Sequence, residues 1–185
     1  MTNYYYTTAA LPTLKLGDKV PISEEKFLEF AQDTLELEDY QILIKSRLDS
    51  VEPTGSLFAD QILSWEKELR LELARARLAK LGFDLPQPLP ESDGRDVLIE
   101  EARSVLSIDS PLEAESSLNS MRWGFLEDIG SSHLFDLEAL LVYYFKLQIA
   151  MRQEKFQREP GKEAFEKTYA AVTESFKNNY TIEKG

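Results

Sequence analysis

The chain has 185 residues, 43% of them apolar and 29% charged, which is typical of a folded globular protein with one domain or two closely packed ones. Its 33 acidic and 21 basic side chains give a formal net charge of −12, and a field of this sign disfavours binding to nucleic acid or to an anionic membrane surface. The absence of cysteine excludes a disulfide framework, a thiol nucleophile and a thiolate metal site.

The first 82 residues are predicted to hold three helices after an aromatic N-terminal segment. Segment 4–12 is aromatic and apolar, and its pattern fits either a short strand or an initial helix. Ser23 is followed by two glutamates, which is typical of an N-cap with acids in the first turn, and it predicts a short helix. Apolar residues at helical spacing predict a second helix over about 38–48 and a much longer one over 56–82.

Segment 83–94 is the one obvious linker in the sequence. It contains three alternating prolines, which cannot continue a helix and which restrict the residue before each of them. We therefore expect an N-terminal helical half over 1–82, a Pro-rich linker over 83–94 and a C-terminal helical half over 95–185.

The C-terminal half is predicted to hold four helices. A short one covers about 95–107, and a longer one begins after Ser110, where Ser-Pro-Leu-Glu is typical of a capping box with proline at the first helical position. That helix is expected to run to 129 and to stop at Gly130. A long helix then follows Asp136, a predicted N-cap, and ends before residue 160. Phe and Tyr residues at helical spacing predict a last amphipathic helix over about 165–176.

The helix over 135–152 is apolar on nearly every face. From Ala139 to Met151 only Lys146 and Gln148 are polar, and a helix of this kind is normally buried among other helices. The sequence thus predicts an all-α protein: a multi-helix bundle of about seven helices, in two packed halves, with two long helices. A shift of 78 residues places the apolar pattern of 62–78 on 140–156, which an internal duplication or a chance alignment of Leu-rich helices would both explain.

The residues that carry chemistry form no catalytic, cofactor or metal motif. The single histidine, His133, follows two serines at a helix start, where a capping segment is a simpler interpretation than a nucleophile with its base. Glu36, Glu38 and Asp39 lack the alternating ligand loop of a calcium site and are interpreted as a solvated helix face. The eight glycines form neither a phosphate-binding loop nor a dinucleotide motif.

The densest basic stretch is on the long helix of the N-terminal half. Arg70, Arg75, Arg77 and Lys80 lie near the helix C-terminus, where the helix dipole favours cations. Interleaved glutamates argue against a nucleic-acid stripe, and a contact with an acidic protein surface is the alternative interpretation. Three successive tyrosines at 4–6 cannot all point the same way, so at least one of them is a candidate interface residue.

Two segments resemble a known family. Segment 65–82 (WEKELRLELARARLAKLG) is similar to the helical repeat of the C (or d) subunit of V/A-type rotary ATPases, and segment 135–152 is similar more loosely. The whole chain, including its N-terminal tyrosines and Trp123-Gly-Phe-Leu-Glu-Asp128, resembles an uncharacterised bacterial family whose genes tend to lie among those for V-type ATPase subunits. The chain is shorter than the C subunit that it resembles.

This resemblance implies a mechanical function without nucleotide binding: a non-catalytic accessory or C/d-like stalk subunit that helps to join the rotating central stalk to the membrane ring. Its partners would be V/A-type ATPase stalk subunits, and its location cytoplasmic, peripheral to the membrane through the complex. The candidate partner-binding residues are Tyr5, Trp65, Arg70, Arg75 and Arg77. The alternatives are a stand-alone helical adaptor with an unrelated protein partner, and an enzyme or small-ligand carrier built in a helix bundle.

The sequence also bears on location. The N-terminus lacks a basic region followed by an apolar run, as a secretory signal would have. The longest near-apolar run is about 13 residues, short of the roughly 20 that a bilayer-spanning helix needs. We therefore expect a cytoplasmic protein without direct membrane insertion.

Overall fold

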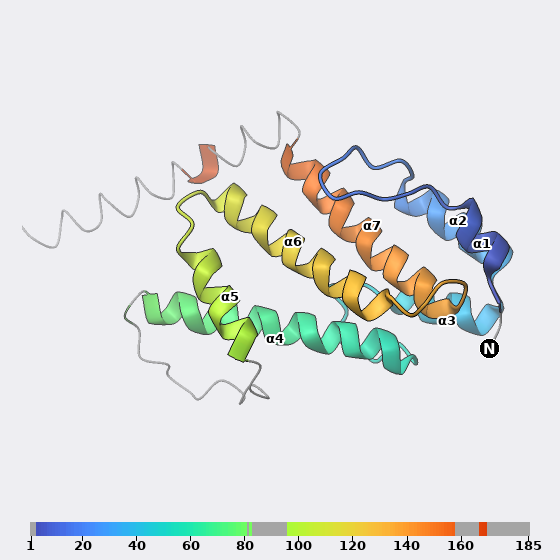
Figure 1. Ribbon diagram of the computed structural model, residues 1–185, viewed down its shortest axis with the longest axis horizontal. Helices are drawn as coiled ribbons and strands as arrows, with labels where there is room; N and C mark the ends of the chain where they lie inside the picture. The colour runs from blue at the N-terminus through green and yellow to red at the C-terminus, as the bar shows by residue number, and fades with distance from the viewer. Residues whose placement is uncertain (1–2, 81, 83–95, 158–166, 170–185) are drawn as a thin grey trace, which may run out of the picture.

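The computed structural model describes residues 3–80, 82, 96–157 and 167–169. Within these ranges every regular element is helical, which confirms the predicted all-α class. Figure 1 shows the helices in chain order: α1 (Tyr5–Ala10), α2 (Glu24–Thr34), α3 (Leu37–Lys45), α4 (Leu57–Lys80), α5 (Asp96–Leu106), α6 (Pro111–Gly130) and α7 (Leu137–Gln157). Residues 167–169 form a further helical fragment. The predicted linker 83–94 and most of the predicted last helix lie outside the described residues.

The predicted helix starts are confirmed by side-chain caps. Ser23, Ser110 and Asp136 each accept, through a side-chain oxygen, the backbone N–H three residues further on, at 3.3, 3.4 and 3.0 Å. Each bond satisfies one of the donors that a helix N-terminus leaves unpaired. The undecided segment 4–12 forms a helix, α1, whose first intrahelical bond runs from Thr8 N to Tyr4 O.

Helix α3 ends at Lys45, earlier than the predicted end at 48, and the reason is a side chain of α7. The carboxamide of Gln148 donates to the backbone oxygen of Ser46 and accepts from the backbone N–H of Leu48, both at 3.0 Å. These two bonds replace the intrahelical ones that another turn of α3 would make. Gln148 is one of the two polar residues in the central part of α7, and its polarity serves this backbone contact.

Helix α7 is buried among other helices, as its apolar sequence predicts. It runs beside α6 (Figure 1) and also contacts α3 and α4. Its buried side chains point in several directions around the helix: Leu140, Leu141, Tyr144, Phe145, Leu147 and Ile149 are at most 1% exposed. Lys146 is partly buried, and its ammonium lies over the Trp123 ring and pairs with Glu127 at 3.3 Å.

Two clusters of buried apolar side chains hold the helices together. The larger one joins α2, α3, the first turns of α4, α6 and α7, and so takes residues from both sides of segment 83–94. The smaller one joins the middle of α4 to α5 and α6 through residues such as Leu69, Val105 and Leu118. How the chain divides into two halves stays a prediction. In the part of the chain described, no helix combines the length and the apolar character needed to cross a bilayer.

Two neighbouring tyrosines of α7 bury their hydroxyl groups against the N-terminal elements. Tyr143 donates to the backbone oxygen of Pro12 at 3.0 Å, and Tyr144 donates to Glu24 Oε1 at 2.7 Å. Burial raises the pKa of Tyr143 to about 12. Burial, followed by the hydrogen bond to Glu24, also raises the pKa of Tyr144.

These shifts predict a loss of stability in alkali. A tyrosine in the unfolded chain releases its proton near pH 10, whereas folded Tyr143 keeps its proton until about pH 12. The unfolded state therefore binds fewer protons in this window, and the free energy of unfolding falls as the pH rises from about 10 to about 12. Tyr143→Phe should make this fall shallower, and losing the bond to Pro12 should cost about 1 kcal/mol at neutral pH.

Urea unfolding at a series of pH values measures both effects. The control is Tyr6→Phe, because the Tyr6 side chain is 86% exposed and its substitution should leave the wild-type curve unchanged. An equally steep alkaline fall in the Tyr143→Phe variant would contradict this account of the tyrosine.

Candidate functional site

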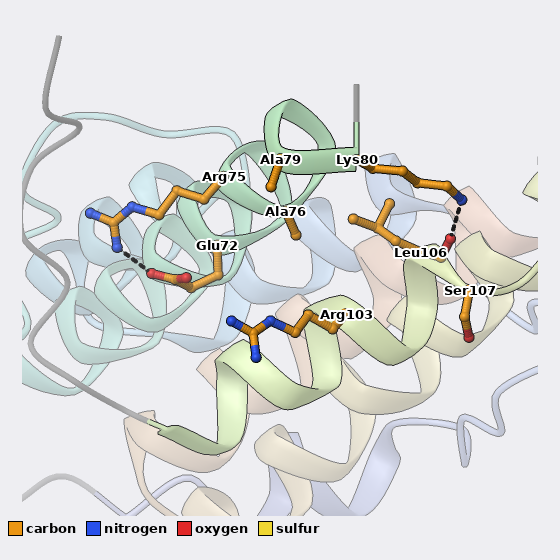
Figure 2. Close-up of a pocket in the computed structure, with 8 residues that line it drawn as sticks. All are labelled: Glu72, Arg75, Ala76, Ala79, Lys80, Arg103, Leu106 and Ser107. Carbon is orange, nitrogen blue, oxygen red and sulfur yellow. Dashed lines mark hydrogen bonds and ion pairs between the residues drawn. The ribbon is translucent and has the colours of Figure 1, made fainter. Parts of the chain in front are cut away.

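A groove of about 870 Å³ lies between α4 and α5. Figure 2 shows its middle formed by Ala76 and Ala79, with charged side chains toward the two ends. The residues that line it are Glu72, Arg75, Ala76, Ala79 and Lys80 from α4, Arg103 and Leu106 from the end of α5, and Ser107 directly after α5. Its size, and its position on the basic stretch of α4, make this groove the candidate site.

The spacing of the lining residues explains why they share one wall. Positions 72, 76 and 79–80 recur every three or four residues, so they lie on the same face of α4. The adjoining face of α4 packs on α5 and α6 through the smaller core, where Leu69 and Ala102 are fully buried. Because Ala76 and Ala79 have short side chains, the space above that core is left unfilled.

The rim of the groove is cationic. At one end Arg75 pairs with the buried carboxylate of Glu72, with 2.5 Å between Nη1 and Oε1. At the other end Lys80 Nζ donates to the backbone oxygen of Leu106 at 2.7 Å, close to the C-terminus of α5, where the helix dipole favours a cation. Arg103 is exposed and has no ion-pair partner among the described residues. Three cations thus face one carboxylate, in a chain of net charge −12.

The three arginines predicted to bind a partner do not lie together in the structure. Arg75 lines the groove, whereas Arg77 is exposed on α4 and is absent from the lining. Arg70 donates to Oε1 of Glu66, one turn earlier on α4, at 2.7 Å, and to the backbone oxygen of Leu48 at 3.0 Å. Arg70 therefore lies toward the segment after α3 rather than toward α5.

The two aromatic candidates lie elsewhere. Trp65 is only 7% exposed and stacks on Phe125 of α6, with the ring centroids 4.1 Å apart, so in the folded protein it is a packing residue. Tyr5 on α1 is half exposed, and its ring contacts those of Tyr6 and Phe135. The structure thus brings only Arg75 of the five candidates into the groove. A role in partner binding stays a prediction for all five.

Sequence reasoning missed Arg103. The residue lies on a predicted helix, but nothing in the local pattern distinguishes it from other surface cations. Its position opposite Ala76 and Ala79 depends on how α5 packs on α4, which is tertiary information. Lys80 was visible as part of the basic stretch, although its bond across the groove was not.

A second feature missed by sequence reasoning is a buried ion pair at the centre of the fold. Arg122 of α6 makes two bonds to the Glu66 carboxylate of α4, at 2.9 Å from Nε and 3.1 Å from Nη2. The same guanidinium donates to Asn119 Oδ1 at 3.1 Å, and Asn119 in turn donates to Gln153 Oε1 on α7 at 2.8 Å. Both charged side chains are less than a tenth exposed. The polar groups satisfy one another and tie three helices together.

One group of side chains at the start of α7 has the spacing of metal ligands. Atoms of His133, Asp136 and Glu138 lie within 4.8 Å of one another. Their observed bonds belong to helix capping: Asp136 accepts from the backbone of Ala139 and from the His133 ring, at 3.0 and 2.7 Å. The positive end of the helix dipole at this position also disfavours a cation. The predicted capping segment explains the group.

The acidic cluster after α2 also has a structural explanation. Tyr4 is buried, and its hydroxyl donates to Asp39 Oδ2 at 2.5 Å. The Tyr4 hydroxyl oxygen also accepts from the backbone N–H of Glu36 at 3.3 Å. Burial, followed by the bond to Asp39, raises the pKa of Tyr4 to about 12. The carboxylate of Asp39 thus anchors α1 on the start of α3.

The described residues define an all-helical protein with an open, cation-rimmed groove. The chain belongs to the family described as a protein of unknown function, DUF2764, whose sequence profile matches residues 29–174. No curated protein and no solved structure matches the chain. These comparisons establish the family and provide no link to V-type ATPase subunits.

The buried pair generates a prediction about stability. Arg122→Met should lower the free energy of unfolding by about 3 kcal/mol, because the Glu66 carboxylate stays buried with Arg70 as its remaining charged partner. Replacing both charges, with Glu66→Leu and Arg122→Met together, should recover most of that loss. Arg47→Met is the matched control, because Arg47 is half exposed in its pair with Glu24 and should change stability by less than about 1 kcal/mol.

Urea unfolding of the four proteins measures these differences. A loss in the Arg122→Met variant no larger than that in the Arg47→Met variant would contradict the structural importance of the pair. A double variant less stable than Arg122→Met alone would contradict it as well.

Proposed function

We propose that this protein is a non-catalytic helical subunit that acts through protein–protein contacts, as an accessory or C/d-like stalk subunit of a bacterial V/A-type rotary ATPase. The observation that carries the proposal is a coincidence of two features on α4. Segment 65–82, which resembles the helical repeat of the C (or d) subunit, contains the α4 wall of the groove from Glu72 to Lys80. The part of the chain with the resemblance is thus also the part with an open surface.

The build of the molecule supports a mechanical function. Helix α4 has 24 residues, and at 1.5 Å per residue it is about 36 Å long. It is held to α6 by the buried pair between Glu66 and Arg122, and α6 is held to α7 through Asn119 and Gln153. A rod fixed at its middle to two other long helices is suited to transmit force between partners at its ends.

The sequence is consistent with a function by contact. It contains no phosphate-binding loop, no dinucleotide motif and no nucleophile with a base. A stand-alone helical adaptor with another protein partner would share these features and the groove, since a fold does not define a function. The two hypotheses differ in the partner, so the partner is what an experiment must identify.

Co-purification tests the proposal directly. The tagged protein, extracted gently from its native host, should recover the soluble sector of the V/A-type ATPase, central-stalk subunits included. Arg77→Glu should reduce the recovery about tenfold, the effect of about 1.4 kcal/mol, because it reverses an exposed charge on the helix that carries the resemblance. Lys19→Glu is the matched control, with the same charge change on the exposed loop between α1 and α2.

Quantitative mass spectrometry of the eluates gives the recovery. A wild-type eluate without ATPase subunits would contradict the proposal. Recovery of a different stoichiometric partner in that eluate would favour the stand-alone adaptor.

A further inference from the structure

The groove between α4 and α5 is shaped for an elongated ligand rather than for an enclosed small molecule. Four of its lining residues, Ala79, Lys80, Arg103 and Ser107, are exposed. Pockets for small molecules typically bury most of the ligand surface, which an open groove cannot do. A ligand that lies along the groove and leaves its outer face outside the groove fits this shape better.

The walls of the groove favour a helix as that ligand. From Glu72 to Lys80 the α4 wall extends over about 12 Å, or roughly two helical turns. Ala76 and Ala79 form its middle (Figure 2), and short side chains allow two helices to approach to the 8–10 Å that close packing requires. Leu106 adds apolar surface from α5. Recognition of an amphipathic helix by an apolar groove between two helices is a recurring mode of protein binding.

The charged side chains of the groove favour a negatively charged ligand. Arg75 and Arg103 lie toward one end and Lys80 toward the other, so that cations flank the apolar middle on both sides (Figure 2). Glu72 offsets one of them through its pair with Arg75. Cations therefore outnumber carboxylates among the lining residues, although the chain as a whole is strongly negative. A partner with carboxylates on both flanks of an apolar stripe matches this arrangement and gains from electrostatic complementarity.

We infer that the α4–α5 groove is the docking site for an acidic amphipathic helix of a partner protein. This inference rests on the proposed function in that it names the chemistry of the partner's contact. It concerns one surface, however, and can be tested without the ATPase. Arg103 is the residue that contributes most to selectivity, because its charge is exposed and has no ion-pair partner among the described residues.

A designed peptide is the probe. It is a fluorescein-labelled helix of about four turns, with leucines along one face and glutamates on both flanks. Its matched control has lysine in place of every glutamate. Fluorescence anisotropy should show that the full chain binds the acidic peptide with a dissociation constant on the order of 10 μM, and the basic peptide at least tenfold more weakly. The preference should decrease as salt is added.

Two variants locate the binding in the groove by independent means. Arg103→Glu reverses the free charge and should weaken binding of the acidic peptide about tenfold or more. Ala79→Trp preserves the charge and fills the middle of the groove, so it should weaken binding to a similar extent. Lys19→Glu, outside the groove, should bind as the wild type does. Circular dichroism and thermal unfolding confirm that each variant is folded before its affinity is compared.

Several results would overturn the inference. These are no binding of the acidic peptide at concentrations on the order of 1 mM, equal binding of the two peptides, or wild-type affinity in both groove variants. Light scattering addresses a second copy of the chain as the occupant: a dimer that Ala79→Trp dissociates would also overturn it. If the peptide result is negative while co-purification succeeds, the docking site is wrong and the proposed function stands. If the peptide binds in the groove while co-purification recovers no ATPase subunits, the docking site stands and the proposed function is wrong.

Discussion

The bidentate pair between Glu66 and Arg122 is the interaction on which the arrangement of the helices depends. Its two charges are buried between α4 and α6, and such a pair adds little net stability compared with apolar residues of the same size. Its contribution is to specificity, because any other register of α4 against α6 would leave a buried charge unpaired. Asn119 and Gln153 extend the same constraint to α7. One polar network thereby fixes the positions of the three long helices α4, α6 and α7 relative to one another.

The groove follows from this constraint. Helix α5 reaches the rest of the molecule mainly through α4, so the position of α4 decides where α5 lies. The smaller core fixes the inner faces of both helices, whereas their outer faces separate at Ala76 and Ala79. A rigid interior and an open outer edge therefore come from the same pair of helices. In the proposed function this combination lets one element both carry force and receive a partner.

Local patterns were sufficient to predict α2 to α7 and the burial of α7, whereas they left segment 4–12, which forms α1, undecided between strand and helix. Caps such as Ser23 and Ser110 act within one turn, and an apolar helix without a polar face has no alternative to burial. Contacts between distant residues were not predictable: Glu66 and Arg122 are 56 positions apart, and Gln148 ends α3 from another helix. Trp65 illustrates the difference, because the family resemblance suggested a partner contact, whereas packing between α4 and α6 buries its ring against Phe125.

In the proposed function, the α4–α5 groove is the surface that meets a V/A-type ATPase. Hydrogen exchange of the full chain, alone and with the purified soluble sector of the ATPase, is the decisive experiment, because exchange reports protection segment by segment. We expect slower exchange of backbone amides in 72–80 and 102–107 in the presence of the sector, and unchanged exchange in the buried middle of α7. Unchanged exchange along both groove walls would contradict it, whether or not another surface became protected.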